Sequence, residues 1–115
     1  MIFNNDKPIY LQMADRLCDE ILAGTYAADS RIPSVREYAV MLEVNTNTVV
    51  KAYEELARAN VIYNKRGVGY FVTPGAREQI VRERREQFMK ELPELFRRMR
   101  LLGIGISDLV NIWQQ

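Results

Sequence analysis

The sequence predicts a mainly α-helical protein that carries one small β-hairpin, and three observations support this fold class. Apolar residues recur every three or four positions through three successive stretches, as helices with one buried face require. Residues typical of helix caps stand at the ends of these stretches. Near residues 62–73 the period changes to two, in short β-prone runs on either side of Arg66-Gly67-Val68-Gly69, which we expect to form the turn.

The first helix is expected to start at Asp6-Lys7-Pro8 and to end at Gly24. Asp6 offers an N-cap acceptor, and a proline in the first turn lacks only an N–H that the helix would not use. The lone cysteine, Cys18, lies on the apolar stripe of this helix, so we expect it in the core. That stripe repeats every four residues through Ile9, Met13, Leu17 and Ile21.

Two further helices follow, separated by a tight turn at Glu43-Val44. Ser34 and Glu37 have the spacing of a capping box, in which each side chain accepts a hydrogen bond from the other residue's backbone N–H. Asn45 is the expected N-cap of the third helix, and Asn60 is its expected left-handed terminator. The expected buried positions are Val35, Tyr38, Ala39 and Leu42, then Val49, Ala52, Tyr53, Leu56 and Ala57.

The C-terminal segment, residues 76–115, is expected to form two helices after Pro74-Gly75 closes the first domain, residues 1–75. Pro93 should kink or break the first of these helices, because proline lacks the N–H that continues the hydrogen-bond ladder. Ser107 should cap the second. An apolar seam runs along this charged segment, from Val81 through Phe88, Leu92, Leu95 and Met99 to Leu102.

Composition argues against an enzyme. The 115 residues include no histidine and one cysteine, which excludes an internal disulfide, imidazole metal ligands and histidine-activated nucleophiles. The carboxylates fall among lysines and arginines, with no pair set apart in an apolar cleft. We therefore expect no catalytic site, no metal and no cofactor.

Charge and hydropathy say little about the partner. The net charge is +1, with eight basic and nine acidic side chains in residues 1–75. A claim of nucleic-acid binding must therefore rest on where the charges lie. No apolar run approaches the roughly 18 residues that span a bilayer, and Asn4, Asn5 and Asp6 do not resemble a signal peptide. We expect a cytoplasmic protein that does not bind membranes.

The second and third helices have the arrangement of a helix-turn-helix, and the hairpin after them makes the winged version. The first turn of the third helix presents Thr46, Asn47 and Thr48, with Lys51 further along the outward side. Helix N-termini favour phosphate, and recognition helices read base edges from this end. We interpret Asn45 mostly as a cap, with Thr48 as a second candidate for that role, while Thr46 and Asn47 face a partner.

The hairpin turn combines positive charge with little side-chain bulk. Lys65 and Arg66 stand beside Gly67 and Gly69, so the tip could approach a sugar-phosphate backbone or enter a minor groove. The alternative is that the glycines only permit the turn. Both interpretations can hold together.

Four motifs in order resemble the winged helix-turn-helix domain of the GntR family of bacterial transcription regulators. The short two-helix segment that follows resembles the YtrA subfamily. The resemblance covers roughly residues 7–75 and implies a dimeric, sequence-specific DNA-binding regulator, expected to be a repressor with a palindromic operator, in an operon for an ABC transporter. The motifs are PIYLQM at 8–13, IPSVREYA at 32–39, NTVVKAYEEL at 47–56 and RGVGYFV at 66–72.

Carried over by position, the resemblance assigns Arg36 to the DNA backbone or a base. It also implies wing contacts by Arg66, Gly67 and Gly69, and a major-groove surface made by Asn45, Thr46, Asn47, Thr48 and Lys51.

The sequence departs from the family pattern at three positions. Thr46 and Val50 stand where many members have arginine, so a guanine preference is not carried over. Glu43 replaces a usual glycine, at a cost of about 1 kcal/mol if that residue needs a positive φ.

Arg36, Lys51, Lys65 and Arg66 give about four phosphate contacts, too few for tight binding by a monomer. We therefore expect a homodimer on double-stranded DNA, with an interface that includes Phe88, Leu92, Leu95, Met99 and Trp113. In the alternative, these side chains fold back on their own domain. No small-molecule effector site is expected within one protomer, since two short helices give too little room. The competing function is a winged-helix module that binds another protein and not DNA.

Overall fold

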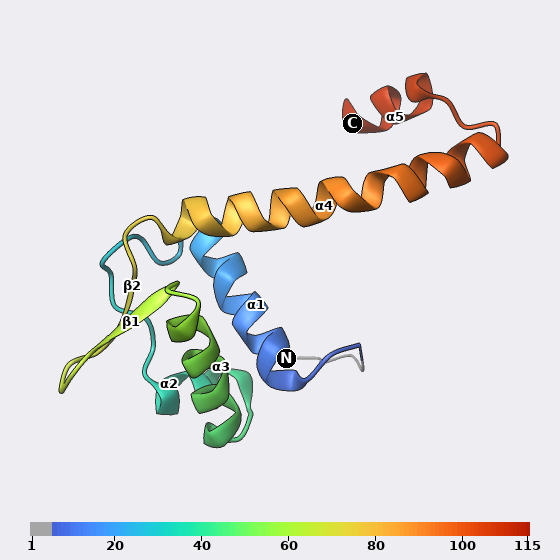
Figure 1. Ribbon diagram of the computed structural model, residues 1–115. Coiled ribbons are helices and arrows are strands. Elements are labelled where there is room, and N and C mark those ends of the chain that lie inside the picture. The colour runs from blue at the N-terminus through green and yellow to red at the C-terminus, as the bar shows by residue number, and fades with distance from the viewer. Residues whose placement is uncertain (1–5) are drawn as a thin grey trace. The chain divides into compact units, whose positions relative to one another are not determined.

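The computed structural model describes residues 6–115, which form five α-helices and one two-stranded antiparallel sheet (Figure 1). This confirms the predicted fold class. The chain divides into two compact units, Met1–Val81, which we call the head, and Arg82–Gln115, which we call the tail. The predicted domain boundary between residues 75 and 76 stays a prediction. The elements in order are α1 (Ile9–Leu22), α2 (Val35–Leu42), α3 (Thr46–Arg58), β1 (Ile62–Lys65), β2 (Gly69–Val72), α4 (Ala76–Leu101) and α5 (Ile106–Trp113).

The core of the head forms where α1 and α2 pack against α3. Tyr38 and Tyr53 are fully buried, with ring centroids 6.0 Å apart. The Tyr53 hydroxyl donates a hydrogen bond to the Pro33 carbonyl at 2.6 Å, so this large side chain is buried without leaving its polar atom unsatisfied. Cys18 is buried, as its place on the apolar stripe predicts. Ala57 is exposed, contrary to expectation, because it lies at the margin of the stripe near the end of α3.

The predicted cap of α2 is confirmed, and that of α1 is wrong. Ser34 and Glu37 make the reciprocal capping box, with both hydrogen bonds at 3.1 Å. In α1 the N-cap is Pro8, with no side-chain cap, and Asp6 lies outside the helix. The reason is that the Pro8 backbone is extended, with ψ 145°, so the helix begins only at the next residue.

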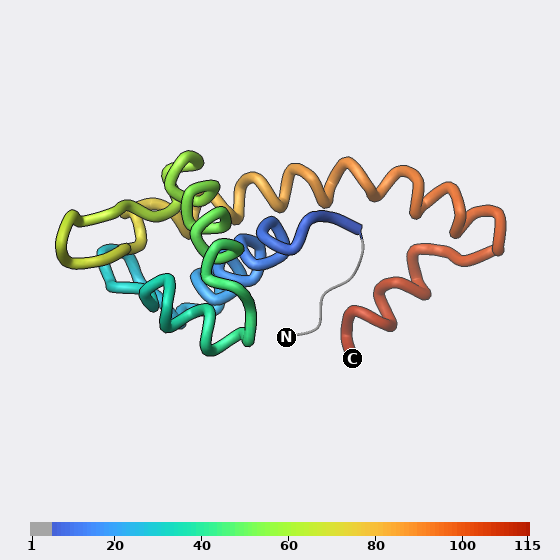
Figure 2. The backbone as a smooth tube through the Cα atoms, turned by 90° about the horizontal axis from the view of Figure 1, so that it is seen from below, coloured from blue at the N-terminus to red at the C-terminus, as the bar shows by residue number. Residues whose placement is uncertain are grey.

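The hairpin has a third segment paired beside it. β1 and β2 pair from Ile62 opposite Val72 to Lys65 opposite Gly69. The loop between α1 and α2 then pairs with the outer side of β2, through a bridge between Arg31 and Phe71. Figure 2 shows the loop between the two strands projecting beyond the helices of the head. With α2, the tight turn and α3, this hairpin completes a winged helix-turn-helix.

Pro93 does not break α4, which runs without interruption from Ala76 to Leu101. Proline removes one N–H and clashes with one carbonyl, and the surrounding residues, mostly strong helix formers, keep the helix intact on both sides. The predicted N-cap of α5, Ser107, is also wrong, because the N-cap is Gly105. The helix starts earlier, at Ile106, because the Asp108 carboxylate accepts a hydrogen bond from the Gly105 N–H at 2.9 Å.

Within residues 6–115, no helix has both the length and the apolar character needed to cross a membrane. In the same residues, no three or more His, Cys, Asp or Glu side chains lie together in a group that could hold a metal ion.

Candidate nucleic-acid interface

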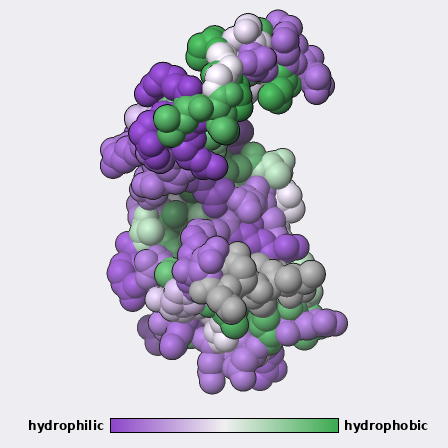
Figure 3. Space-filling view, turned by 90° about the vertical axis from the view of Figure 1, so that its right-hand side faces the viewer, coloured by the Kyte–Doolittle hydropathy of each residue, from purple (hydrophilic) through white to green (hydrophobic). Residues whose placement is uncertain are grey.

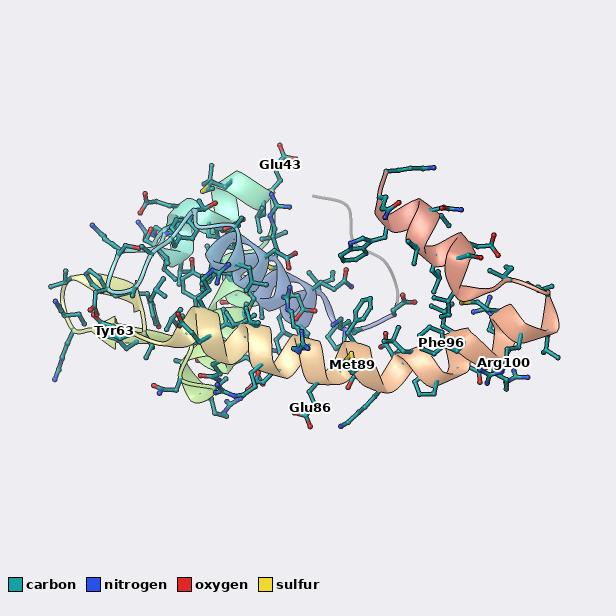
Figure 4. All side chains as sticks on the ribbon, turned by 90° about the horizontal axis from the view of Figure 1, so that it is seen from above. Glu43, Tyr63, Glu86, Met89, Phe96 and Arg100 are labelled. Carbon is teal, nitrogen blue, oxygen red and sulfur yellow. The ribbon has the colours of Figure 1, made fainter. Side chains whose placement is uncertain are left out.

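A two-residue turn sets the position of α3 on α2. Glu43 has φ 55° and ψ 50°, the left-handed conformation, and its side chain projects into solvent (Figure 4). The Val44 N–H donates to the Ala39 carbonyl at 3.0 Å, which closes the end of α2. Since the chain reverses within this turn, the amino end of α3 emerges at the surface of the head.

At that end, one residue caps the helix and its neighbours remain open. The Asn45 side-chain oxygen accepts the Asn47 N–H at 2.8 Å, so Asn45 is the N-cap that the sequence predicts. The side chains of Thr46 and Asn47 are exposed, Thr48 is half-buried, and the core-facing side of the helix begins at Val49. The first turn of α3 therefore presents short polar groups to any partner that approaches it.

The start of α1 lies beside this end of α3. Ile9, Tyr10, Asn47, Thr48 and Lys51 line a shallow hollow of about 230 Å³. The Lys51 Nζ lies 5.9 Å from the centroid of the Tyr10 ring, a cation–π distance. The sequence did not lead us to predict a role for Tyr10, which lies inside the first motif and off the four-residue apolar stripe. A hydroxyl-bearing aromatic residue off the apolar stripe was the available signal.

The wing holds its cations on an aromatic surface. The Lys65 Nζ lies 4.8 Å from the Phe71 ring centroid, and Tyr63 stacks on the same ring at 5.7 Å. The Tyr63 hydroxyl donates to Asp29 at 2.8 Å, which raises the pKa of that tyrosine. Arg66 is exposed at the tip. The hairpin is thus braced from its base while its charged end stays accessible.

The candidate cations carry uncompensated charge. Among the described residues, none of the four that the sequence singles out makes an ion pair, and all four are exposed: Arg36, Lys51, Lys65 and Arg66. Elsewhere in the head, Lys7 pairs with Asp15, Arg16 with Glu20, and Arg58 with Glu55. Within the described part of the head, positive groups without an ion pair therefore occur on α2, α3 and the wing, and also at Arg31 and Arg77, although the head as a whole is almost neutral.

The tail leaves most of its apolar side chains in solvent. Trp113 is 90% exposed and Phe88 65%, Leu95 is exposed as well, and α5 has no buried residue. Figure 3 shows hydrophobic side chains, in green, on the surface of the tail. Met99 is 7% exposed and Leu92 is half-buried, so these two lie deeper than the other predicted interface residues. Phe96 of α4 helps to line a hollow of about 240 Å³ that continues to Ile106 (Figure 4).

Comparison with known proteins identifies a family that shares the fold of the head. Residues 9–72 match the family model described as bacterial regulatory proteins, gntR family. A curated relative is the HTH-type transcriptional repressor YtrA of Bacillus subtilis, 31% identical over 102 residues, which covers 89% of this chain and 78% of YtrA.

Solved structures are also similar to this chain in fold and in sequence. A GntR-family transcriptional regulator from Bacteroides thetaiotaomicron is 51% identical, with a TM-score of 0.75 over 92% of this chain and 94% of that one. The DNA-binding domain of AraR, in complex with operator ORR3, is 26% identical, with a TM-score of 0.57 over 64% of this chain and 88% of that one. The family model alone spans more than half of the sequence, and it coincides with the winged helix-turn-helix of the head. The chain therefore belongs to the GntR family of bacterial transcription regulators.

Proposed function

We propose that this protein is a dimeric transcription repressor that places the amino end of α3 in the major groove of a palindromic operator. The observation that carries the proposal is the exposed first turn of α3, flanked by cations that have no ion-pair partner among the described residues. The similarity to AraR, whose DNA-binding domain is in complex with an operator, supports the same placement. The similarity to the YtrA repressor supports repression.

Each side chain of the first turn has a distinct task. Asn47 reads a base edge, since an amide can pair with both N6 and N7 of adenine. Thr46 and Thr48 adapt to neighbouring bases or a phosphate. Asn45 uses its oxygen as the cap, which leaves its amino group to donate at the groove margin.

The surrounding cations hold the backbone. Lys51 and Arg36 contact phosphates on either side of the groove, and Tyr10 joins them through the hollow that it shares with Lys51. In the wing, Lys65 and Arg66 reach the adjacent backbone or minor groove, and Gly67 and Gly69 keep the tip narrow. Phosphate contacts fix the register, while the α3 side chains supply sequence preference.

Dimerisation follows from the number of contacts and from the tail. About four phosphate contacts per subunit become eight in a dimer, and affinity rises steeply with that number. Burying exposed apolar surface contributes about 25 cal/mol per Å². We assign the interface to the tail of each subunit, with Phe88, Leu92, Leu95, Met99 and Trp113 in it. The target expected from the YtrA resemblance is an operon for an ABC transporter.

A second candidate function has its own observation. The head contains exposed Val40 and Met41 on α2, at 79% and 57%, and it lacks the arginines that many members carry at positions 46 and 50. Apolar surface of this kind favours a protein partner. In that case the winged helix would bind protein and not DNA.

A gel shift with a duplex from the promoter of the protein's own gene separates the two functions. The parent should bind this duplex more tightly than random DNA. Asn47→Ala should relax base preference, and Lys51→Ala should weaken binding to all sequences while reducing the salt dependence of the dissociation constant by about one phosphate per subunit. Arg58→Ala, at the far end of α3, is the control and should bind as the parent does. If both variants bind the promoter duplex and random DNA as the parent does, the assigned face is wrong.

A further inference from the structure

The loop between α1 and α2 is part of the wing. The Asp29 N–H donates to the Val72 carbonyl at 2.8 Å, and the Ile32 N–H donates to the Tyr70 carbonyl at 3.0 Å. Between them, Arg31 forms the backbone bridge to Phe71. Arg31, which lies 38 residues before Gly69 in the sequence, is thereby fixed alongside β2.

The Arg31 guanidinium lies close to Gly69, the first residue of β2. A Cβ atom built on Gly69 would lie 2.9 Å from the Arg31 Nε and 3.4 Å from its Nη2. At Gly67, the other glycine of the wing, a Cβ would meet nothing within 4 Å. Both glycines have positive φ, at +144° and +78°, but only Gly69 also makes room for a guanidinium. The Arg31 guanidinium thus lies close to the wing backbone at Gly69, in room that a Cβ there would reduce.

The donors of this guanidinium remain available. Arg31 is exposed, and among the described residues its side chain makes no hydrogen bond and no ion pair. It shares a hollow of about 250 Å³ with Glu37 of α2. The Glu37 carboxylate already accepts the Ser34 N–H; the hydrogen bonds with Ser34, and secondarily the charge of Arg31, lower the pKa of Glu37. Arg31 therefore lies between the first turn of α2 and the wing.

We propose that Arg31 is a further phosphate contact of the DNA interface and that Gly69 is its positioning residue. A guanidinium presents a planar fork that matches two phosphate oxygens, and fixing the Arg31 backbone beside the wing before binding reduces the entropy lost on contact. Arg31 then connects the phosphate contacts of Arg36 on α2 with those of the wing. This inference rests on the proposed function, which places DNA across these elements.

The test measures dissociation constants for duplexes that the parent protein selects from a random library, over a range of salt concentrations. Arg31→Gln should raise the dissociation constant about tenfold and reduce the salt slope by about one phosphate per subunit. Arg31→Lys, which keeps the charge and loses the fork, should recover the salt slope but only part of the affinity. Melting temperatures should stay at the parent value for both.

Glycine variants test the positioning. Gly69→Ala displaces Arg31 and strains the backbone, whereas Gly67→Ala, the matched control, only strains the backbone. Gly69→Ala should therefore weaken binding more in the parent than in an Arg31→Gln background, whereas Gly67→Ala should have the same effect in both backgrounds. Independent effects of Arg31→Gln and Gly69→Ala would overturn the positioning role.

The outcomes separate this inference from the function on which it rests. If the parent selects a duplex and Arg31→Gln keeps both the affinity and the salt slope, Arg31 is no phosphate contact and the proposed function stands. If the parent selects no duplex at all, both are overturned. Arg58→Gln, in which an exposed arginine paired with Glu55 is lost, controls for the change of charge.

Discussion

Glu43 illustrates how a single residue can conflict with its local conformation and still be kept by the fold. The turn between α2 and α3 requires φ 55° at this position, where an L-residue pays for the proximity of its Cβ to the backbone. Asn60 adopts a similar φ of 61° at the end of α3, but asparagine tolerates it better. The sequence marks both sites as helix ends, and the structure shows that the positive φ considered for Glu43, where the family usually has glycine, is present.

Glu43→Gly should raise the free energy of unfolding of the head by about 0.5–1 kcal/mol, since it removes the Cβ at a positive φ. Urea denaturation of the full chain measures this. Glu43→Ala is the matched control, because it removes the charge and keeps the Cβ, and it should show no such gain. A glycine variant that is no more stable than the alanine variant would contradict the strain at this turn.

Glu20 carries a second local conflict, in its charge. Its carboxylate is partly buried, one of its oxygens has no hydrogen-bond partner, and this burial raises its pKa despite the hydrogen bond from Tyr38 and the charge of Arg16. The folded state therefore binds a proton more readily than the unfolded state. Glu20 therefore adds to the free energy of unfolding at acidic pH relative to neutral pH. This contribution is lost as the pH rises through the raised pKa of Glu20.

Glu20→Gln should stabilise the head at pH 7, and its advantage over the parent should disappear below the ordinary glutamate pKa of 4.5. Urea denaturation at pH 7 and at pH 4 gives the comparison. Glu54→Gln, an exposed substitution on α3, controls for the loss of one negative charge. A stabilisation that is equal at both pH values would refute the burial of charge as its cause.

At the scale of elements, the sequence predicts what local chemistry decides. The capping box at Ser34, the cap at Asn45 and the left-handed ends are short-range features, and all are present. The caps predicted at Asp6 and Ser107 fail because each has a competing local solution: the extended backbone of Pro8 in one case, and Asp108, three residues after the N-cap Gly105, in the other.

The features that no local pattern predicts are contacts between distant segments. Tyr10 meets Lys51 across 41 residues of sequence, and Arg31 meets Gly69 across 38. Each depends on how α1, α3 and the wing pack, which a periodic pattern leaves open. The parts of the candidate site on α3 and at the wing tip could be predicted from the sequence. The parts at Tyr10 and Arg31 could not.

Pro93 gives an element-scale prediction. A proline in a helix interior costs about 3 kcal/mol relative to alanine, through the missing hydrogen bond and the clash with the carbonyl of Met89. Pro93→Ala should therefore slow amide hydrogen exchange in α4 around residues 89–97. Exchange in α3 serves as the internal reference and should not change. Unchanged protection around residue 93 would show that the proline does not weaken the helix.

At the scale of the whole molecule, the proposed role of the tail is to join two subunits. The tail exposes more apolar side chains than two helices surrounded by water usually do. The proposed operator contacts also require two subunits. Phe88 is exposed within one chain, so replacing it should not disturb the fold of that chain. Its substitution therefore probes association.

Phe88→Asp should raise the dimer dissociation constant at least about tenfold, since a charge buried at an interface is costly. Sedimentation velocity at about ten micromolar protein should show a dimer for the parent and more monomer for the variant. Gln87→Asp, one residue away on α4, is the control and should sediment as the parent does. A monomeric parent at this concentration would exclude the tail as the dimerisation unit.

The most direct test of the whole account locates the amino end of α3 on DNA. Cys18 is buried, so a Cys18→Ala background keeps a small apolar residue in the core, and Glu43→Cys, at an exposed position just before the amino end of α3, allows an iron–EDTA cleavage reagent to be attached at residue 43 alone. On a selected duplex, this protein should cut within two half-sites about one helical turn, or a multiple of it, apart. The same reagent on Arg58→Cys, at the other end of α3, should cut weakly or not at all. Protein that binds the duplex and cuts from residue 58 but not from residue 43 would contradict the placement of α3 in the groove.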